Sequence, residues 1–352
     1  MKHIRIPRLA KSEIILLFLF LAVLALRLVP GLGEVYALRV YPVVSYLLSL
    51  LSACVPFSLD EVMVVAMGLL LLAYPFVARW RRVRARLILR RELVFVAWIY
   101  VWFYIGWGAN YYRTDFYTRT GVKVLRADSL QFRSFLEHYT ARLNASYTQK
   151  PSPEHSSIID SVKSLYTSLP AEVGVCRPRS FQQPKRVLFN SLYSAVSVLG
   201  YMGPFAGESQ LNMQLRPVQY PFTYAHELAH LLGVSSEAEA NFWAYCVCRR
   251  SSDDFIRYSA YFGLLPYVVR NAKGLLSEVE FNAWIATVRP SILRQWKSQR
   301  EFWFSQRSEW LDSLQTALYD WFLTSNNVQG GVANYDQVVG MVVSVECSGL
   351  EF

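Results

Sequence analysis

Cysteine and histidine are both scarce in this sequence, with five of each in 352 residues. The cysteines are too few and too scattered for a disulfide framework, and Cys246 and Cys248 would point to different faces of a helix. Their scarcity argues against a disulfide-rich domain and against a cysteine-based zinc or redox site. The small number of histidines gives weight to any pattern that two of them form.

Net positive charge is also scarce outside two short clusters. The net charge is +10, but eleven Lys and Arg residues occur in segments 2–11 and 79–91, so the rest of the chain is close to neutral. A nucleic-acid-binding domain needs basic residues clustered on its own surface. We therefore expect no nucleic-acid partner, and the two clusters instead resemble the cytoplasmic flanks of membrane spans.

Long apolar runs are confined to the first 110 residues. We predict membrane spans over residues 13–30, 62–78 and 92–109, because each run is long enough to cross the hydrocarbon core. The apolar segment 36–56 is predicted to be an interfacial or re-entrant helix, since a further crossing would move one basic cluster out of the cytoplasm. A signal peptide is a competing interpretation of the first run, but no small-residue cleavage site follows it.

The spans and the basic clusters together predict a topology. The positive-inside rule keeps the N-terminus and the second cluster in the cytoplasm, so three spans carry the rest of the chain outward. We expect a membrane domain over residues 1–110 and an extracytoplasmic domain over residues 111–352. In a bacterium, this is a multi-pass protein of the inner (cytoplasmic) membrane with a periplasmic C-terminal domain.

The region after residue 110 has the composition of a soluble domain and is predicted to be mainly helical, with helix-length patterns nearly throughout residues 221–352. Residues 200–215 contain Gly and Pro and then alternate polar with apolar residues, which predicts a short strand. Within them, "GESQLN" is either an edge strand that pairs with an extended peptide or a loop. The predicted fold class is mainly α: transmembrane helices followed by a mostly helical α+β domain with a small sheet.

Two of the five histidines form the pattern H-E-x-x-H in "HELAH", residues 226–230. Side chains four residues apart share one face of a helix, so His226 and His230 can both bind one Zn²⁺. Glu227 can then approach a metal-bound water from the side and act as its general base. Gly233 is expected to end the helix. No apolar run of membrane length encloses the motif, which argues against an intramembrane protease.

A third ligand is expected on a neighbouring element, because catalytic zinc usually takes three protein ligands and keeps one position open. "EAEAN" begins a second helix capped by Ser235 or Ser236, and a tight turn folds it back across the first helix. We predict that Glu237 is the ligand and that Asn241, on the same face, hydrogen-bonds a ligand histidine. Glu239 points roughly 200° away from Glu237 and is expected to have neither role.

The pattern H-E-x-x-H followed by E-x-x-A-[D/N] resembles the gluzincin metallopeptidases, which include the CAAX prenyl proteases and the bacterial heat-shock membrane proteases. The resemblance implies a zincin-like domain in which His226, His230 and Glu237 bind Zn²⁺ and Glu227 is the catalytic base. It also implies a peptide or protein substrate. The seven-residue step from His230 to Glu237 is shorter than in the better-known gluzincins.

The whole architecture is similar to a Bacteroidetes family of unknown function. The shared features are three N-terminal membrane helices, "VPFSLDE" before the second span, "GESQLN" upstream of H-E-x-x-H, and "NYDQVVGMVV" near the C-terminus. This resemblance covers nearly the full chain. It implies the architecture, and the expected activity comes from the motif residues.

The sequence therefore predicts a membrane-anchored zinc metallopeptidase that hydrolyses peptide bonds outside the cytoplasm, with a peptide substrate and the lipid bilayer as its partners. The alternatives are a non-catalytic, zinc-stabilised receptor or scaffold of the same fold, and an ordinary helix with a histidine pair. The transition state also needs a donor to the developing oxyanion. Tyr258 is our first candidate for this donor, and Tyr261, Arg257 and Tyr335 are others.

Overall fold

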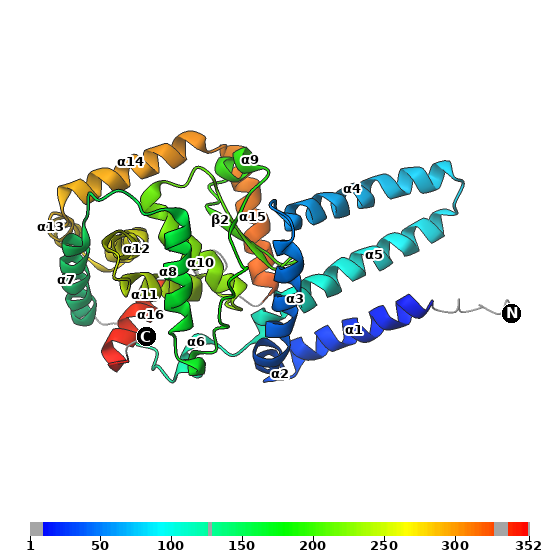
Figure 1. The fold of residues 1–352 in the computed structure, drawn as a ribbon, viewed down its shortest axis with the longest axis horizontal. Helices are drawn as coiled ribbons and strands as arrows, with labels where there is room; N and C mark the ends of the chain where they lie inside the picture. The colour runs from blue at the N-terminus through cyan, green and yellow to red at the C-terminus, as the bar shows by residue number, and fades with distance from the viewer. Residues whose placement is uncertain (1–9, 126–128, 327–336, 351–352) are drawn as a thin grey trace.

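The computed structural model describes residues 10–125, 129–326 and 337–350, and these residues are mainly helical with one small three-stranded sheet (Figure 1). Three long helices project from one side of a larger body that contains the sheet and the remaining helices. The mainly helical content and the small sheet confirm this part of the predicted fold class.

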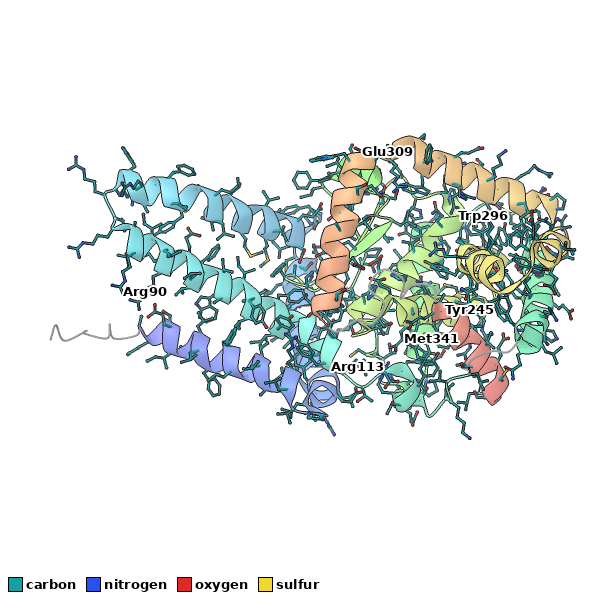
Figure 2. The ribbon with its side chains drawn as sticks, turned by 180° about the vertical axis from the view of Figure 1, so that it is seen from behind. Arg90, Arg113, Tyr245, Trp296, Glu309 and Met341 are labelled. Carbon is teal, nitrogen blue, oxygen red and sulfur yellow. The ribbon has the colours of Figure 1, made fainter. Side chains whose placement is uncertain are left out.

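The three projecting helices are α1 (Lys11–Leu28), α4 (Leu59–Trp80) and α5 (Ala85–Gly106), and α5 packs against both of the others. Their outer surfaces carry exposed apolar side chains; Phe76 of α4, for example, is 78% exposed. Arg90 of α5 pairs with Glu13 of α1 at 2.5 Å, and it lies toward the far end of this bundle (Figure 2). A bundle with so much apolar surface outside is unusual for a protein surrounded by water.

Two helical stretches of the described residues are long and apolar enough to cross a membrane, Leu32–Ala53 and Leu59–Trp80. The second contains the predicted span 62–78. The first covers the segment 36–56 as far as Ala53 and consists of α2 (Leu32–Val35), the π-helical turn η1 (Tyr36–Val40) and α3 (Tyr41–Ala53). In Figure 1, α3 runs across the ends of the projecting helices rather than alongside them. Helices α1 and α5 are not among these stretches, because charged residues interrupt their apolar runs.

The body surrounds two central helices, α10 (Tyr220–Leu231) and α11 (Glu237–Arg249), which pack closely on each other. Every residue of α11 from 237 to 248 is buried, as expected of a helix enclosed on all sides. The enclosing helices are α8 (His155–Thr167), α12 (Asp254–Leu275) and α16 (Gln337–Ser348). The other helices of the body are α6 (Phe116–Thr120), α7 (Ser129–Ser146), α9 (Asn190–Ala195), α13 (Glu278–Ile285), α14 (Pro290–Gln306) and α15 (Glu309–Ser325), with the 3₁₀ turns η2 (Gly108–Tyr112), η3 (Ala171–Val173) and η4 (Pro217–Gln219).

The sheet has the order β1-β3-β2, formed by β1 (Lys185–Arg186), β2 (Gly200–Gly203) and β3 (Glu208–Leu211). Strand β3 pairs in parallel with β1 and antiparallel with β2, with Tyr201 opposite Gln210. The prediction of a strand in "GESQLN" is correct, but its placement at the sheet edge is wrong. The two residues of β1 occupy the second side of β3, so β3 is the central strand, β1 and β2 are the two edge strands, and β2 lies against α10.

The carboxylate of Glu208 joins the sheet to the base of the bundle. It accepts hydrogen bonds from the hydroxyls of Ser52 and Ser58 and from the backbone N–H of Asp60. It also forms an ion pair of 2.9 Å with Lys185 of β1, and both side chains are almost fully buried. Burial alone would raise the pKa of Glu208, but these donors lower it below its usual value. The segments "VPFSLDE" and "GESQLN" are therefore two halves of one buried contact.

Replacing Glu208 with Gln should lower the free energy of unfolding by about 3 kcal/mol, because Lys185 would stay buried without its counter-charge. Denaturant titration in detergent micelles measures this change. The matched control is Glu301→Gln on α14, where the Glu301 side chain is 65% exposed, and it should change stability by less than about 0.5 kcal/mol. Equal stability of the two variants would contradict the assigned role of Glu208.

Candidate metal centre

Local sequence explains the hairpin that α10 and α11 form. Pro221 occupies the first turn of α10, where its missing N–H has no helical partner to lose. Gly233 has a φ of +95°, the left-handed conformation that ends the helix as predicted. Ser236 then caps α11 by accepting a hydrogen bond from the Glu239 N–H. Arg113, which Figure 2 places where the bundle meets the body, holds the turn by donating to the Gly233 carbonyl at 3.1 Å.

This hairpin brings the three predicted ligands together. His226 Nε2 and His230 Nε2 are 3.1 Å apart, and Glu237 Oε2 lies 3.1 Å from the first and 3.3 Å from the second. In a tetrahedral site with bonds of about 2.1 Å to zinc, ligand atoms are about 3.4 Å apart. The three atoms therefore form a nearly equilateral triangle of the size that one zinc ion requires, and they are a possible metal site within the described residues.

The charged groups of this triangle shift the pKa values of Glu237 and His230 in the direction opposite to that of burial. Burial alone would raise the pKa of Glu237, but His230 and His226 hold it well below its usual value. Burial alone would lower the pKa of His230, but the Glu237 carboxylate raises it to about 9. A positive charge is thus favoured beside the Glu237 carboxylate, and without a metal the His230 imidazole supplies it as a bound proton.

Glu227 is 5% exposed and stands beside the triangle. Burial raises its pKa to about 7, although the two histidines oppose the shift. Its side chain lies directly against Gly200 of β2, where an added Cβ would fall 2.6 Å from Glu227 Oε1. A side chain at position 200 would therefore push the carboxylate away, and the absence of one gives Glu227 its place beside the edge strand.

Glu239 has the structural role that its direction on the helix predicts. Its carboxylate accepts hydrogen bonds from Arg119 and, at 2.9 Å, from the indole N–H of Trp243. Burial alone would raise the pKa of Glu239, but Arg119 and Arg113 lower it below its usual value. Arg119 also donates to the Val173 carbonyl at 2.9 Å, so this ion pair fastens α11 to the outer loops.

The histidine orientation differs in part from the prediction. His230 Nδ1 lies 2.7 Å from the Val234 carbonyl oxygen, a contact that presents Nε2 to the metal position. The backbone of the tight turn thus makes the hydrogen bond to a ligand histidine that we predicted for Asn241. Asn241 is buried one turn beyond Glu237, and neither its Nδ2 nor His226 Nδ1 has a hydrogen-bond partner in the described part of the chain. A bond between Asn241 and a ligand histidine is not formed there.

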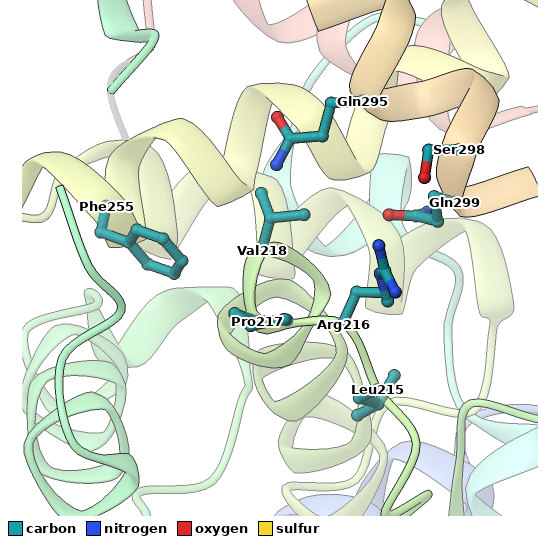
Figure 3. Close-up of a pocket in the computed structure, with 8 residues that line it drawn as sticks. All are labelled: Leu215, Arg216, Pro217, Val218, Phe255, Gln295, Ser298 and Gln299. Atoms are coloured by element: carbon teal, nitrogen blue, oxygen red, sulfur yellow. The ribbon is translucent and has the colours of Figure 1, made fainter. Parts of the chain in front are cut away.

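The structure also corrects the choice of Tyr258 as transition-state donor. The Tyr258 hydroxyl donates to Gln295 Oε1 at 2.6 Å, and its ring packs on Tyr147. Gln295 lines a separate cavity of about 270 Å³ between η4, α12 and α14, with Arg216 and Gln299 on its other walls (Figure 3). None of the metal-site residues lines this cavity, and no described contact joins Tyr258 to them.

The other predicted donors are likewise engaged elsewhere. Arg257 donates to Asp254 and to the Ser251 carbonyl near the start of α12. Tyr261 packs between the rings of Tyr139 and Tyr245. Tyr335 lies outside the described residues. The helical pattern from residue 254 identified α12 correctly, but it did not show which face of that helix turns toward the metal site.

Two tyrosines that the sequence did not single out lie within electrostatic range of the site. Tyr201 of β2 is close enough to Glu227 for the two charges to interact, and the charge of Glu237 acts on Tyr111 of η2. Burial, more than these charges, raises the pKa of both phenols well above the usual value. Both hydroxyls therefore keep their protons and can donate hydrogen bonds. The position of Tyr201 follows from β2, a strand that the sequence pattern did not predict.

Comparison with known proteins identifies the family. The model of a family described as "Protein of unknown function (DUF3810)" matches residues 36–343. The chain belongs to this family. The DUF3810 match extends from η1 into α16 and includes the sheet, the hairpin and the three candidate ligands. No curated protein and no solved structure matches the chain. The resemblance to gluzincins therefore rests on the motif residues alone.

Purified protein should contain about one equivalent of zinc, because three protein ligands of this spacing define one site. His226→Ala should lower the zinc content below about half an equivalent, as measured by inductively coupled plasma mass spectrometry. His138→Ala, at an exposed position on α7, is the control and should retain the metal. Metal-free wild type, or equal zinc in the two variants, would rule out the site.

Two glutamates of the same helical turn should separate metal binding from folding. Glu237→Gln should weaken zinc binding, since it removes the anionic ligand. Glu239→Gln should retain zinc but lower the free energy of unfolding by about 3–5 kcal/mol, because it leaves Arg119 buried without a counter-charge. Zinc titration and denaturant unfolding of both variants measure this contrast. The same zinc affinity in both would show that Glu237 is not a ligand.

Proposed function

We propose that this protein is a membrane-anchored zinc metallopeptidase whose site lies outside the cytoplasm. The observation that carries the proposal is the triangle of His226 Nε2, His230 Nε2 and Glu237 Oε2, whose atoms are spaced closely enough to bind one zinc ion. Glu227 is buried beside this triangle. A zinc ion between the three atoms would balance the charge of the buried Glu237 carboxylate and use a lone pair of each imidazole, as their burial requires.

A zinc ion held by these three residues supplies a Lewis acid that polarises a carbonyl oxygen and acidifies water. Glu227 follows the first ligand in the sequence and occupies the side of the triangle next to β2. As the proposed base, the Glu227 carboxylate takes a proton from the attacking water and passes it to the leaving nitrogen. Burial keeps bulk water away from this carboxylate and fixes its direction.

Tyr201 and Tyr111 are the groups that we assign to the developing oxyanion. Their hydroxyls are protonated donors at neutral pH, and each lies within electrostatic range of one of the two site carboxylates. A donor already fixed in a water-poor site stabilises the transition state without reorganisation. We take Tyr201 as the first candidate to test, because the charge of Glu227, the proposed base, acts on it.

The edge strand β2 supports an extended peptide as substrate. In the described residues, β3 pairs with one side of β2 and no strand pairs with the other. An extended peptide can add to such an edge through backbone hydrogen bonds. Because Gly200 of β2 touches Glu227, a peptide on this edge would pass the triangle of ligands.

The placement of the helices supports the proposed topology, in which α1, α4 and α5 cross the membrane. The start of α1 and the basic turn between α4 and α5 lie at the end of the bundle far from the body, as Figure 1 shows. Both belong to clusters that the positive-inside rule keeps in the cytoplasm. The body at the opposite end is then extracytoplasmic, and transverse α3 lies at the membrane surface.

Glu227→Gln should lower peptide hydrolysis by about 10²- to 10⁴-fold and leave zinc bound, since the amide cannot accept the proton. A degenerate peptide library analysed by mass spectrometry measures turnover, and elemental analysis measures the metal. Glu301→Gln on the exposed face of α14 is the matched control. A zinc-loaded wild type that cleaves no peptide would favour a non-catalytic receptor or scaffold with a structural zinc.

Tyr201→Phe should reduce kcat by about 10²- to 10³-fold with little change in KM, as expected when a donor to the oxyanion is removed. Its partner in a ring contact of 6.5 Å, Tyr193 on α9, provides the control Tyr193→Phe, which should be nearly as active as wild type. If Tyr111→Phe shows the larger loss, the oxyanion role belongs to η2 instead.

A further inference from the structure

Strand β2 connects the metal site to the base of the membrane bundle. At its first residue, Gly200, an added Cβ would fall 2.6 Å from the Glu227 carboxylate. At its last residue, Gly203, an added Cβ would fall 2.6 Å from Asp60, in the first turn of α4. One end of the edge strand therefore touches the candidate catalytic base, and the other touches the start of a membrane-length helix.

The turn after β2 is fastened to the bundle by both of its neighbouring helices. Asp60 Oδ1 accepts hydrogen bonds from the N–H groups of Phe205 and Ala206 at 2.8 and 3.2 Å. Trp102 of α5 donates its indole N–H to the Phe205 carbonyl at 3.0 Å. In the last turn of α5, Gly106 lies so close to the Pro204 carbonyl that an added Cβ would be 2.7 Å away. The far end of β2 is thus fixed at the ends of α4 and α5.

Helix α10, which carries the two candidate histidine ligands, is also hydrogen-bonded to the base of the bundle. Trp107, directly after α5, donates its indole N–H to the His230 carbonyl at 2.8 Å. Tyr41 of α3 donates its hydroxyl to the Leu231 carbonyl at 2.8 Å. The candidate metal site is therefore held directly at the end of the bundle rather than on the remote face of the body.

An apolar loop of the body continues the exposed surface of the bundle. Leu188, Phe189 and Leu192 are each about half exposed, between 48% and 51%. The backbone N–H groups of Leu188 and Phe189 donate to Glu61 in the first turn of α4 at 2.6 and 3.4 Å. Such side chains beside the start of a membrane helix fit the boundary between lipid headgroups and acyl chains. The body therefore rests on the bilayer next to β2.

We propose that the substrate is a polypeptide anchored in the same membrane and cut close to its anchor. This inference rests on the proposed peptidase function. A peptide paired with the open edge of β2 would run from the triangle of ligands to the turn at Asp60 and Trp102. The four residues of β2 span about 10 Å at 3.3 Å per residue. The scissile bond would then lie within about six residues of the membrane surface, since only one or two residues lie beyond each end of the strand.

Lipid-linked peptide libraries in vesicles test this inference. Full-length zinc-loaded protein is reconstituted in vesicles of phosphatidylethanolamine and phosphatidylglycerol. Degenerate peptides are attached to a phospholipid at either end, and the same peptides are also supplied free in solution. Mass spectrometry locates each cut, and Glu227→Gln protein gives the background. We expect the anchored peptides to be cut within about six residues of the lipid, with kcat/KM at least about tenfold above the free peptides.

A spacer control separates position from local concentration. A long Gly/Ser spacer between lipid and library keeps the peptide at the vesicle surface but moves its sequence beyond the reach of β2. The proposal expects cutting of the library to fall with the spacer. Equal cutting with and without the spacer, or equal rates for free peptides, would overturn the anchored-substrate inference and leave the peptidase proposal standing. No cutting of any library by zinc-loaded protein would overturn both.

Discussion

The close packing of α10 against α11 is the constraint on which the candidate site depends. Three polar side chains meet in the interior only because a turn of five residues reverses the chain between Leu231 and Glu237. Gly233 adopts the left-handed backbone, and Arg113 and Arg119 neutralise the polar ends of the hairpin from outside. The charges of the site are tolerable in the core because each carboxylate has a cationic neighbour or can bind a proton.

The seven-residue step from His230 to Glu237 requires a tight turn, and contacts from other parts of the body stabilise that turn. A shorter turn brings the carboxylate to the histidines without an intervening loop, and the Val234 carbonyl inside that turn also orients His230. One short segment thus ends a helix, fixes a ring and delivers a ligand. The cost is a crowded turn, and the buried guanidinium groups that surround it stabilise this conformation.

Sequence reasoning reached the features that are encoded locally. Helical spacing predicts the helix of "HELAH" and the opposite directions of Glu237 and Glu239. Capping preferences predict the stop at Gly233 and the serine cap. The structure has each of these features. The mainly helical class and the apolar helix over residues 62–78 follow from composition in the same way.

Sequence reasoning could not predict contacts between residues that are far apart in the chain. "GESQLN" has the alternation of a strand, but nothing in it shows that the two residues of β1 pair with its outer side. Likewise, "GYMG" is too short for a period and too rich in glycine for a strand propensity, so the edge strand and its Tyr201 went unpredicted. The sequence does not show which way Tyr258 and the other candidate donors point, and the direction of Tyr258 is decided by packing between α12 and α14.

The composition of β2 shows how the membrane part and the candidate site constrain each other. Its two glycines lie on opposite faces of the strand, because positions 200 and 203 are an odd number of residues apart. The face at Gly200 admits Glu227, and the face at Gly203 admits Asp60. A strand with side chains at both positions would separate Glu227 from the sheet and the sheet from α4. The short segment "GYMG" thus allows two close contacts at once, one with Glu227 beside the candidate metal site and one with Asp60 of α4.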